Sequence, residues 1–173
     1  MPSSTAKKIA LLGGGIREVE LAKALIAAGF SLSVSGLIPV GQRVPICLPE
    51  EAVCGAVALI LPVSGVRPDG RIKEVSGENA IIVTKELLAQ LAPGALVIVG
   101  KGNLYLSELC QELGFKLLEL TEDDEFAILN SIPTAEGALV VAIESSTITL
   151  HSSSVFVLGF GRCGRAIARM LQG

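Results

Sequence analysis

A glycine pattern near the end of the sequence is the clearest candidate for chemistry. Gly159, Gly161 and Gly164 stand in the order G-x-G-x-x-G, and Arg162 lies inside the motif. Four apolar residues precede the motif and a helical pattern follows it, which is the context of a dinucleotide-binding turn. The first glycine allows a tight turn, the second lets the backbone approach a pyrophosphate, and the third lets the helix pack on the strand. The pattern therefore predicts a dinucleotide site at these four residues.

The acidic residue that would bind the ribose is expected about 20 residues beyond these glycines, which is past Gly173. A lone strand and helix cannot bury their apolar faces. We therefore predict that the chain is a fragment of a longer enzyme and that, by itself, it does not bind NAD or NADP appreciably. The choice between NAD and NADP stays open, because the residue that would decide it is not in the sequence.

A second pattern that could bind an anion lies near the start of the sequence. Arg17 follows three glycines, residues 13–15, at the predicted start of a helix. A helix dipole opposes a cation there, whereas a guanidinium suits a bound carboxylate. The alternative is a surface arginine paired with Glu18 or Glu20. The three glycines depart from G-x-G-x-x-G, which favours an ordinary turn between a strand and a helix over a second nucleotide loop.

Two loops that follow predicted strands supply further candidates. Ser64 and Gly65 follow a strand that ends at Pro62, where hydroxyl and N–H groups can face a cleft. Asn103 follows another strand, although it could equally cap the next helix. Because parallel α/β sheets bind ligands at the carboxyl ends of their strands, these residues are predicted to lie at a ligand-binding edge.

The elements that would position these residues alternate along the chain. Apolar runs predict strands at residues 8–12, 31–35, 56–61, 79–83, 95–99, 115–120 and 155–158, and helical periods predict helices at 16–28, 84–91, 104–113 and 165–171. Two more helices are predicted on either side of a break at residues 131–134, one ending near 130 and one spanning 133–144. The alternation predicts an α/β fold with a doubly wound parallel sheet. A polar stretch at 145–154 separates a first domain, residues 1–150, from residues 151–173, a linker and the first strand and helix of an incomplete dinucleotide-binding domain.

Composition narrows the function classes. Aromatic residues make up 3% of the 173 residues and the net charge is −3, which argues against nucleic-acid partners. The longest apolar run, at about 56–63, is far shorter than the roughly 20 residues of a membrane span, so we expect no membrane association and a cytoplasmic location. The four cysteines show no CxxC spacing and there is one histidine, so we expect no metal site.

Several stretches together resemble the dipicolinate synthase A-subunit family of spore-forming bacteria. The most specific is N-S-I-P-T-A-E-G at residues 130–137. The others are residues 61–65, 149–153 and 157–169, Gly13 and Gly14 with Arg17, and Gly100 with Asn103, Tyr105 and Leu106. The match is colinear and covers essentially the whole chain. It departs from the family at Cys163, where a more polar or small residue is expected, and at the end, because members continue through a complete dinucleotide domain.

The resemblance implies a flavodoxin-like, substrate-side domain followed by a Rossmann domain. It implies an NAD(P)-dependent oxidoreductase that converts a dihydrodipicolinate-type heterocycle to dipicolinate during sporulation. The partners would be this small dicarboxylate and the B subunit of dipicolinate synthase, with a homo-oligomer left open, and the location would be the cytoplasm of the mother cell.

A substrate with two carboxylates needs cations or hydrogen-bond donors. The candidates are Arg17, Ser64, Gly65, Asn103, Ser131 and Thr134; no catalytic residue is assigned. Two alternatives stay open. One is a non-catalytic flavodoxin-like module that binds a small acid or another subunit of an enzyme, and the other is a dehydrogenase of the 2-hydroxyacid type.

Overall fold

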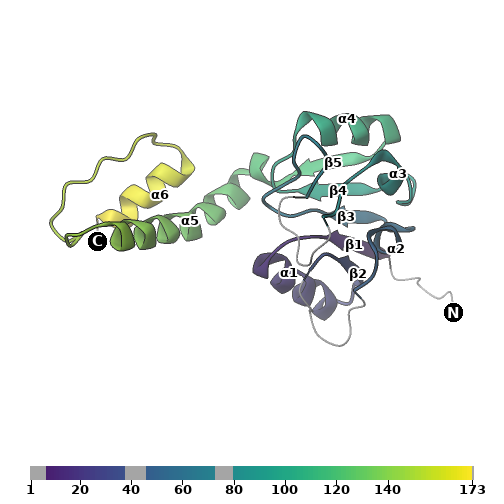
Figure 1. Ribbon diagram of the computed structural model, residues 1–173, viewed down its shortest axis with the longest axis horizontal. Helices are drawn as coiled ribbons and strands as arrows, with labels where there is room; N and C mark the ends of the chain where they lie inside the picture. The colour runs from purple at the N-terminus through teal and green to yellow at the C-terminus, as the bar shows by residue number, and fades with distance from the viewer. Residues whose placement is uncertain (1–6, 38–45, 73–79, 173) are drawn as a thin grey trace. The chain divides into compact units, whose positions relative to one another are not determined.

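The computed structural model describes residues 7–37, 46–72 and 80–172. These residues divide into two compact units, one ending at Leu120 and one beginning at Thr121. We call them the sheet unit and the helical unit, and each is described by itself (Figure 1). The predicted domain boundary near residue 150 falls inside the helical unit and stays a prediction.

Five parallel strands form the sheet of the sheet unit. They are β1 (Lys8–Leu12), β2 (Ser31–Ser35), β3 (Ala58–Ile60), β4 (Leu96–Val99) and β5 (Lys116–Glu119). Their order across the sheet is β2-β1-β3-β4-β5, and every neighbouring pair is parallel. This confirms the predicted doubly wound α/β sheet. It is also the flavodoxin-like order, in which ligands bind where the winding reverses, between β1 and β3.

Four helices accompany these strands: α1 (Ile16–Ala27), α2 (Pro49–Val53), α3 (Lys85–Leu88) and α4 (Leu104–Leu113). Side-chain caps fix where two of them begin. The hydroxyl of Thr84 accepts the N–H of Leu87 at 3.2 Å at the start of α3. The side-chain oxygen of Asn103 accepts the N–H of Leu106 at 2.9 Å at the start of α4.

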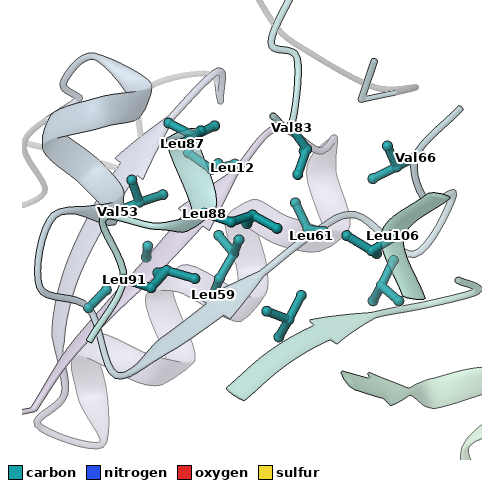
Figure 2. Packing of buried hydrophobic residues seen from close by; sticks show 14 of the residues in the cluster. Leu12, Val53, Leu59, Leu61, Val66, Val83, Leu87, Leu88, Leu91 and Leu106 are labelled. Carbon is teal, nitrogen blue, oxygen red and sulfur yellow. The ribbon is translucent and has the colours of Figure 1, made fainter. Parts of the chain in front are cut away.

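The pleat of the strands sends alternate side chains into two separate cores. From β1, Ala10 and Leu12 enter the larger core, to which α2, α3 and α4 also contribute. Ile9 and Leu11 enter the smaller core, which α1 covers. Figure 2 shows the larger core, where aliphatic side chains such as Leu88 fill the space between sheet and helices. The buried residues of both cores are thus aliphatic apart from Cys110, and Phe115 packs against the larger core from a partly buried position.

The helical unit contains two long elements, α5 (Asp124–Ser145) and α6 (Arg162–Leu171), after a short 3-10 turn, η1 (Leu120–Glu122). Asp123 caps α5 by accepting the N–H of Phe126 at 2.7 Å. The helix α6 packs along α5 (Figure 1). Among the residues described in this unit, only Ser131 and Ala135 are buried.

The predicted helix break at residues 131–134 is wrong. The helix α5 runs through Pro133 as one helix of 22 residues. Proline removes one helix hydrogen bond and usually ends or kinks a helix. Here α6 packs against α5, and the Thr134 hydroxyl donates to the carbonyl of Asn130 at 3.0 Å. Tertiary packing of this kind is not visible in a local sequence pattern.

The continuity of α5 also bears on the expectation that no segment could span a membrane. In the described part of the chain, α5 is the one helix that is long and apolar enough to do so by length and composition. A single such helix is weak evidence for a span. Asp124, Glu125, Glu136 and Glu144 lie along it, and charged residues inside a bilayer are costly.

Three other local predictions differ from the structure. Residues 155–158 form no strand in the described part of the chain, because they have no strand beside them to pair with. Of the predicted strand at 79–83, Ile82 forms only an isolated antiparallel bridge with Arg71, and Asn79 lies outside the described residues. No helix was predicted between the strands at 31–35 and 56–61, but α2 lies there and begins at Pro49, a residue suited to the first turn of a helix.

Candidate functional site

The loops after β1, β3 and β4 meet at one edge of the sheet, because these strands are parallel neighbours. Arg17 is the second residue of α1, just after the β1 loop, and its side chain is exposed. Ser64 and Gly65 lie in the loop after β3, and Asn103 ends the loop after β4. The structure therefore places these four predicted residues at the carboxyl edge of the sheet, as expected.

The loops after β3 and β4 are packed backbone against backbone. A side chain at Gly65 would lie 2.6 Å from the carbonyl oxygen of Lys101, and one at Gly100 would overlap the backbone of Val63. Only glycine has the space to stand at either position. The close approach fixes the backbone that leads into and out of Ser64.

Ser64 is the predicted residue whose polar side-chain atom lacks a partner in the described fold. Its hydroxyl oxygen is buried and has no hydrogen-bond partner among the described residues. A buried hydroxyl without a partner is unfavourable by about 1–3 kcal/mol, so such a group usually meets a bound molecule or water. This observation supports the prediction for Ser64 without testing it.

Gly65 and Asn103 already have partners within the fold. The N–H of Gly65 donates to the carbonyl of Pro62 at 2.9 Å. The side-chain N–H of Asn103 donates to the carbonyl of Val66 at 2.8 Å, while its oxygen caps α4. Their geometry supports the loops around Ser64, and a direct contact with substrate stays a prediction for both.

Two acidic residues at this edge were not predicted. Glu18 is 4% exposed, and its carboxylate accepts the N–H of Gly15 at 2.8 Å and the N–H of Val63 at 3.2 Å. Glu119, at the end of β5, accepts the N–H of Gly102 at 2.8 Å. Glutamate at the third position of a helix is a known capping signal, so the bond to Gly15 could have been found from the sequence. The bonds to Val63 and Gly102 depend on which strands are neighbours and carry no local signal.

The contact of Glu18 with Gly15 also bears on the three glycines at residues 13–15. A phosphate bound at this turn would need the N–H groups at the start of α1. The N–H of Gly15 is already taken by a buried carboxylate. This favours the ordinary turn over a second nucleotide loop.

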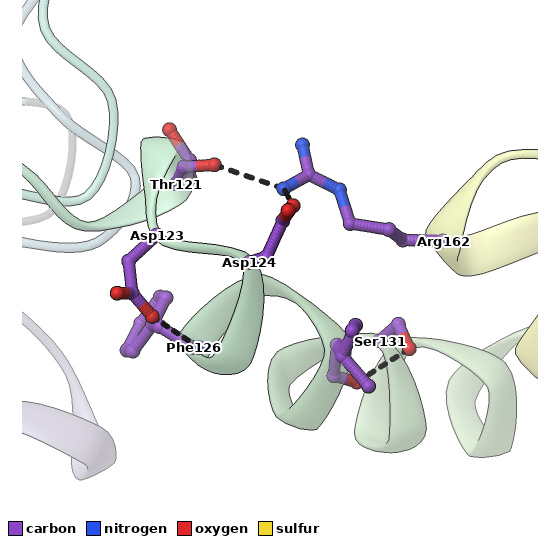
Figure 3. A network of polar contacts seen from close by, with 7 residues as sticks. Thr121, Asp123, Asp124, Phe126, Ser131 and Arg162 are labelled. Atoms are coloured by element: carbon purple, nitrogen blue, oxygen red, sulfur yellow. Dashed lines mark hydrogen bonds and ion pairs between the residues drawn. The ribbon is translucent and has the colours of Figure 1, made fainter.

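The remaining predicted residues lie in the helical unit. The Ser131 hydroxyl is buried in α5 and donates to the carbonyl of Ile128 at 2.6 Å (Figure 3). Thr134 is exposed one turn further along. Both hydroxyls donate to carbonyls of their own helix, and a role in binding stays a prediction.

The glycine motif forms a turn that leads into α6. Gly159 has a φ of +92°, a conformation that favours glycine, and Gly161 caps the helix. A side chain at Gly164 would overlap the carbonyl oxygen of Gly159, whereas one at Gly161 would enter open space. Arg162 points back to the start of α5, where it donates to the carbonyl of Thr121 and pairs with Asp124, both at 3.2 Å (Figure 3).

Comparisons with known proteins show which family this chain is related to. Residues 8–121 match the family model for the N-terminal domain of the A subunit of dipicolinate synthase. The chain is 31% identical over 169 residues to the dipicolinate synthase A subunit of Bacillus subtilis, covering 95% of this chain and 57% of the relative. Thus the chain spans little more than half the length of that protein.

Two crystal structures have the same fold. The dipicolinate synthase A subunit from Bacillus halodurans has a TM-score of 0.89 at 30% identity, over 97% of this chain and 59% of that one. The A chain of dipicolinate synthase from Bacillus subtilis has a TM-score of 0.81 at 31% identity, over 97% and 58%. With its sheet order, its glycine turn and these matches, the chain belongs to the dipicolinate synthase A-subunit family.

Proposed function

We propose that this chain is the N-terminal part of an NAD(P)-dependent oxidoreductase that makes dipicolinate from a dihydrodipicolinate-type precursor during sporulation. The observation that carries the proposal is the glycine turn at the start of α6, in a chain of the dipicolinate synthase A-subunit family. Residues 1–150 would form the substrate-side domain, and residues 151–173 would begin the dinucleotide-binding domain.

The residues of the turn fit a dinucleotide. The open space beside Gly161 leaves room for a pyrophosphate to approach the backbone, and the close contact of Gly164 with Gly159 keeps the turn tight. The start of α6 would add favourable N–H groups, and Arg162 would lie beside them. When bound, a nicotinamide dinucleotide supplies a hydride acceptor. The polypeptide of these 173 residues is expected to bind it weakly on its own.

The reaction requires little from the protein beyond binding and orientation. Oxidation of the precursor to an aromatic ring would need a hydride acceptor, which a bound nicotinamide would supply, and a path for one proton to solvent. Because aromatisation is favourable, correct placement of the ring matters more than a strong base. Arg17 would bind one carboxylate of the precursor as a bidentate partner, and Ser64 would donate to it from the buried edge. Gly65, Asn103, Ser131 and Thr134 complete the proposed set.

The name of the family implies a second polypeptide, and we propose that the chain acts with the B subunit of dipicolinate synthase in the cytoplasm of the mother cell. The enzyme should therefore be assayed as the whole protein with the B subunit present. We expect reduction of NAD or NADP that depends on the precursor, together with dipicolinate detected by chromatography. Absence of both products would refute the function.

Two matched substitutions test the glycine turn. Gly161→Asp places a carboxylate where the pyrophosphate would lie, and it should abolish nicotinamide reduction. Gly137→Asp is the control, because a side chain at Gly137 in α5 also meets open space. Equal activity of the two variants would contradict the assignment of the turn to the cofactor.

The role of Arg17 predicts a change in KM. A bidentate, charge-assisted contact contributes about 1.5–3 kcal/mol, so Arg17→Ala should raise KM for the precursor by about ten- to a hundredfold. Arg17→Lys keeps the charge but loses the paired geometry, and it should recover only part of the loss. An unchanged KM in Arg17→Ala would leave Arg17 as a surface residue.

A further inference from the structure

Glu18 links two loops that are far apart in the sequence. Its carboxylate is buried at the edge of the sheet, and one oxygen accepts the N–H of Gly15 while the other accepts the N–H of Val63. Gly15 ends the loop after β1, and Val63 lies in the loop after β3. Since β1 and β3 are neighbours, this one side chain spans the point where the winding of the sheet reverses.

The surrounding backbone leaves this side chain little freedom. Gly14 has a φ of +121°, and a side chain there would overlap the Cγ of Glu18 and lie 2.7 Å from its carboxyl carbon. The fold therefore holds the Glu18 side chain against Gly14. A carboxylate in this place offers two acceptors to two N–H donors, which no neutral side chain of its length provides.

The loop that Glu18 holds is the one that carries Ser64. Val63 precedes Ser64 directly, and the backbone of Val63 is packed against Gly100 on its other side. The hydroxyl of Ser64 is buried and has no partner among the described residues, so its direction depends on the backbone at residues 63–65. Any shift of the Val63 N–H would move this hydroxyl as well.

We infer that Glu18 is a positioning residue of the proposed substrate site. Its carboxylate fixes the loop after β3 relative to the start of α1, and so it sets the position of Ser64 relative to Arg17. This inference rests on the proposed function, because it assigns Glu18 to the same site. Glu18 itself acts through the two backbone N–H groups and not on the substrate.

The chain offers a matched control on the same helix. Glu20 lies two residues further along α1, is exposed, and pairs with Lys23 at 2.6 Å. Glu18→Gln replaces one acceptor oxygen by an amide NH₂ group. The variant keeps one of the two hydrogen bonds, and its NH₂ group faces the other backbone N–H, which then has no acceptor. Glu20→Gln makes the same chemical change away from the backbone N–H groups that Glu18 binds.

The test combines kinetics with amide NMR spectra of the whole protein. In Glu18→Gln we expect the amide signals of Val63 and Ser64 to shift and KM for the precursor to rise about tenfold, which equals about 1.4 kcal/mol, with kcat little changed. Glu20→Gln should change neither quantity. Glu18→Asp, which keeps two acceptor oxygens on a shorter side chain, should recover part of the loss in KM.

Each alternative outcome decides the question. A Glu18→Gln enzyme with a lower unfolding temperature but a normal KM, measured well below that temperature, would overturn the inference, since Glu18 would then only stabilise the fold. Unmoved signals of Val63 and Ser64 would overturn it as well. An inactive wild-type protein would instead refute the proposed function, and the inference would fall with it, even where the shifted amide signals still showed the two loops to be linked.

Discussion

The sheet unit and the helical unit differ in where their apolar side chains go. In the sheet unit, strand and helix residues such as Leu12, Leu59 and Leu106 are completely buried. In the described part of the helical unit, Ala135 is the only buried apolar residue, while Phe156 is 90% exposed and Leu158 is 98% exposed. The sheet unit thus contains its own core, and the helical unit does not. Its two helices pack on each other, but large apolar side chains of α5, such as Val141 and Ile143, stay exposed.

The two units are therefore stable for different reasons. Burial of a large aliphatic side chain contributes about 1.5–3 kcal/mol, and the sheet unit repeats this on both faces of its sheet. The helical unit relies on one helix pair and its caps, and an isolated helix pair of this size is marginal. Experiments that treat the units separately should therefore give opposite results.

The largest effect is expected when the units are expressed apart. A polypeptide of residues 1–120 should unfold cooperatively, whereas residues 121–173 should show no cooperative transition. The measurement is circular dichroism during thermal and urea unfolding, with the complete chain as the reference. A cooperative transition in the 121–173 polypeptide would show instead that the helical unit is stable by itself.

Shortening a single leucine side chain in each unit should show the same difference, with smaller changes in the free energy of unfolding. Leu12→Ala removes a fully buried side chain and should lower the free energy of unfolding by about 2–5 kcal/mol. Leu158→Ala removes an exposed side chain of the same type and should change it by no more than about 0.5 kcal/mol. Urea titration of both variants checks this. A loss at Leu158 comparable to that at Leu12 would mean that its side chain is buried in solution.

The reactivity of one cysteine in each unit tests the same difference in burial. Burial raises the pKa of the Cys110 thiol in α4 to about 11, from an ordinary value of 9.0. At a pH near 8 its thiolate fraction should then be about a hundredfold lower than that of an ordinary thiol. Cys163 in α6 is exposed. Iodoacetamide should therefore label Cys163 well before Cys110, as mass spectrometry of tryptic peptides would show.

The same shift gives a dependence of stability on pH. The folded state favours the protonated thiol of Cys110, so this contribution is complete below about pH 9 and is lost as the pH rises through about 11. Urea unfolding of the wild type and of Cys110→Ala across this range isolates the effect. If the free energy of unfolding falls equally in the two proteins as the pH rises, groups other than Cys110 cause the alkaline destabilisation.

The sequence predicts the sheet unit well, because its signals are local. The bounds of β1, β2 and α4 agree with the prediction, since each has an apolar pattern that stops at a glycine or a polar cap. The edge of the sheet was also predicted, because the carboxyl ends of parallel strands must meet there. Thus the fold class and the loops that carry Arg17, Ser64 and Asn103 followed from pattern alone.

The errors arise where a residue depends on partners that are distant in the sequence. Pro133 predicts a break by its own chemistry, but packing of α6 on α5 supports an unbroken helix. Residues 155–158 have the composition of a strand, but a strand forms only beside another strand. Glu18 was considered only as a surface partner for Arg17, although its contact with Val63 requires knowing that β3 lies beside β1.

The parallel sheet has a consequence for how the chain folds. No two neighbouring strands are joined by a hairpin, and β1 pairs with residues as distant as Ala58 in β3. Each strand pair must therefore await the closure of a long loop, which places the sheet unit among the slower folders of its size. During synthesis on the ribosome, the inner edge of β1 stays unpaired until β3 emerges, although β2 is already available. The apolar β1 strand, which lies between β2 and β3 in the finished sheet, is thus the segment that molecular chaperones would have to protect first.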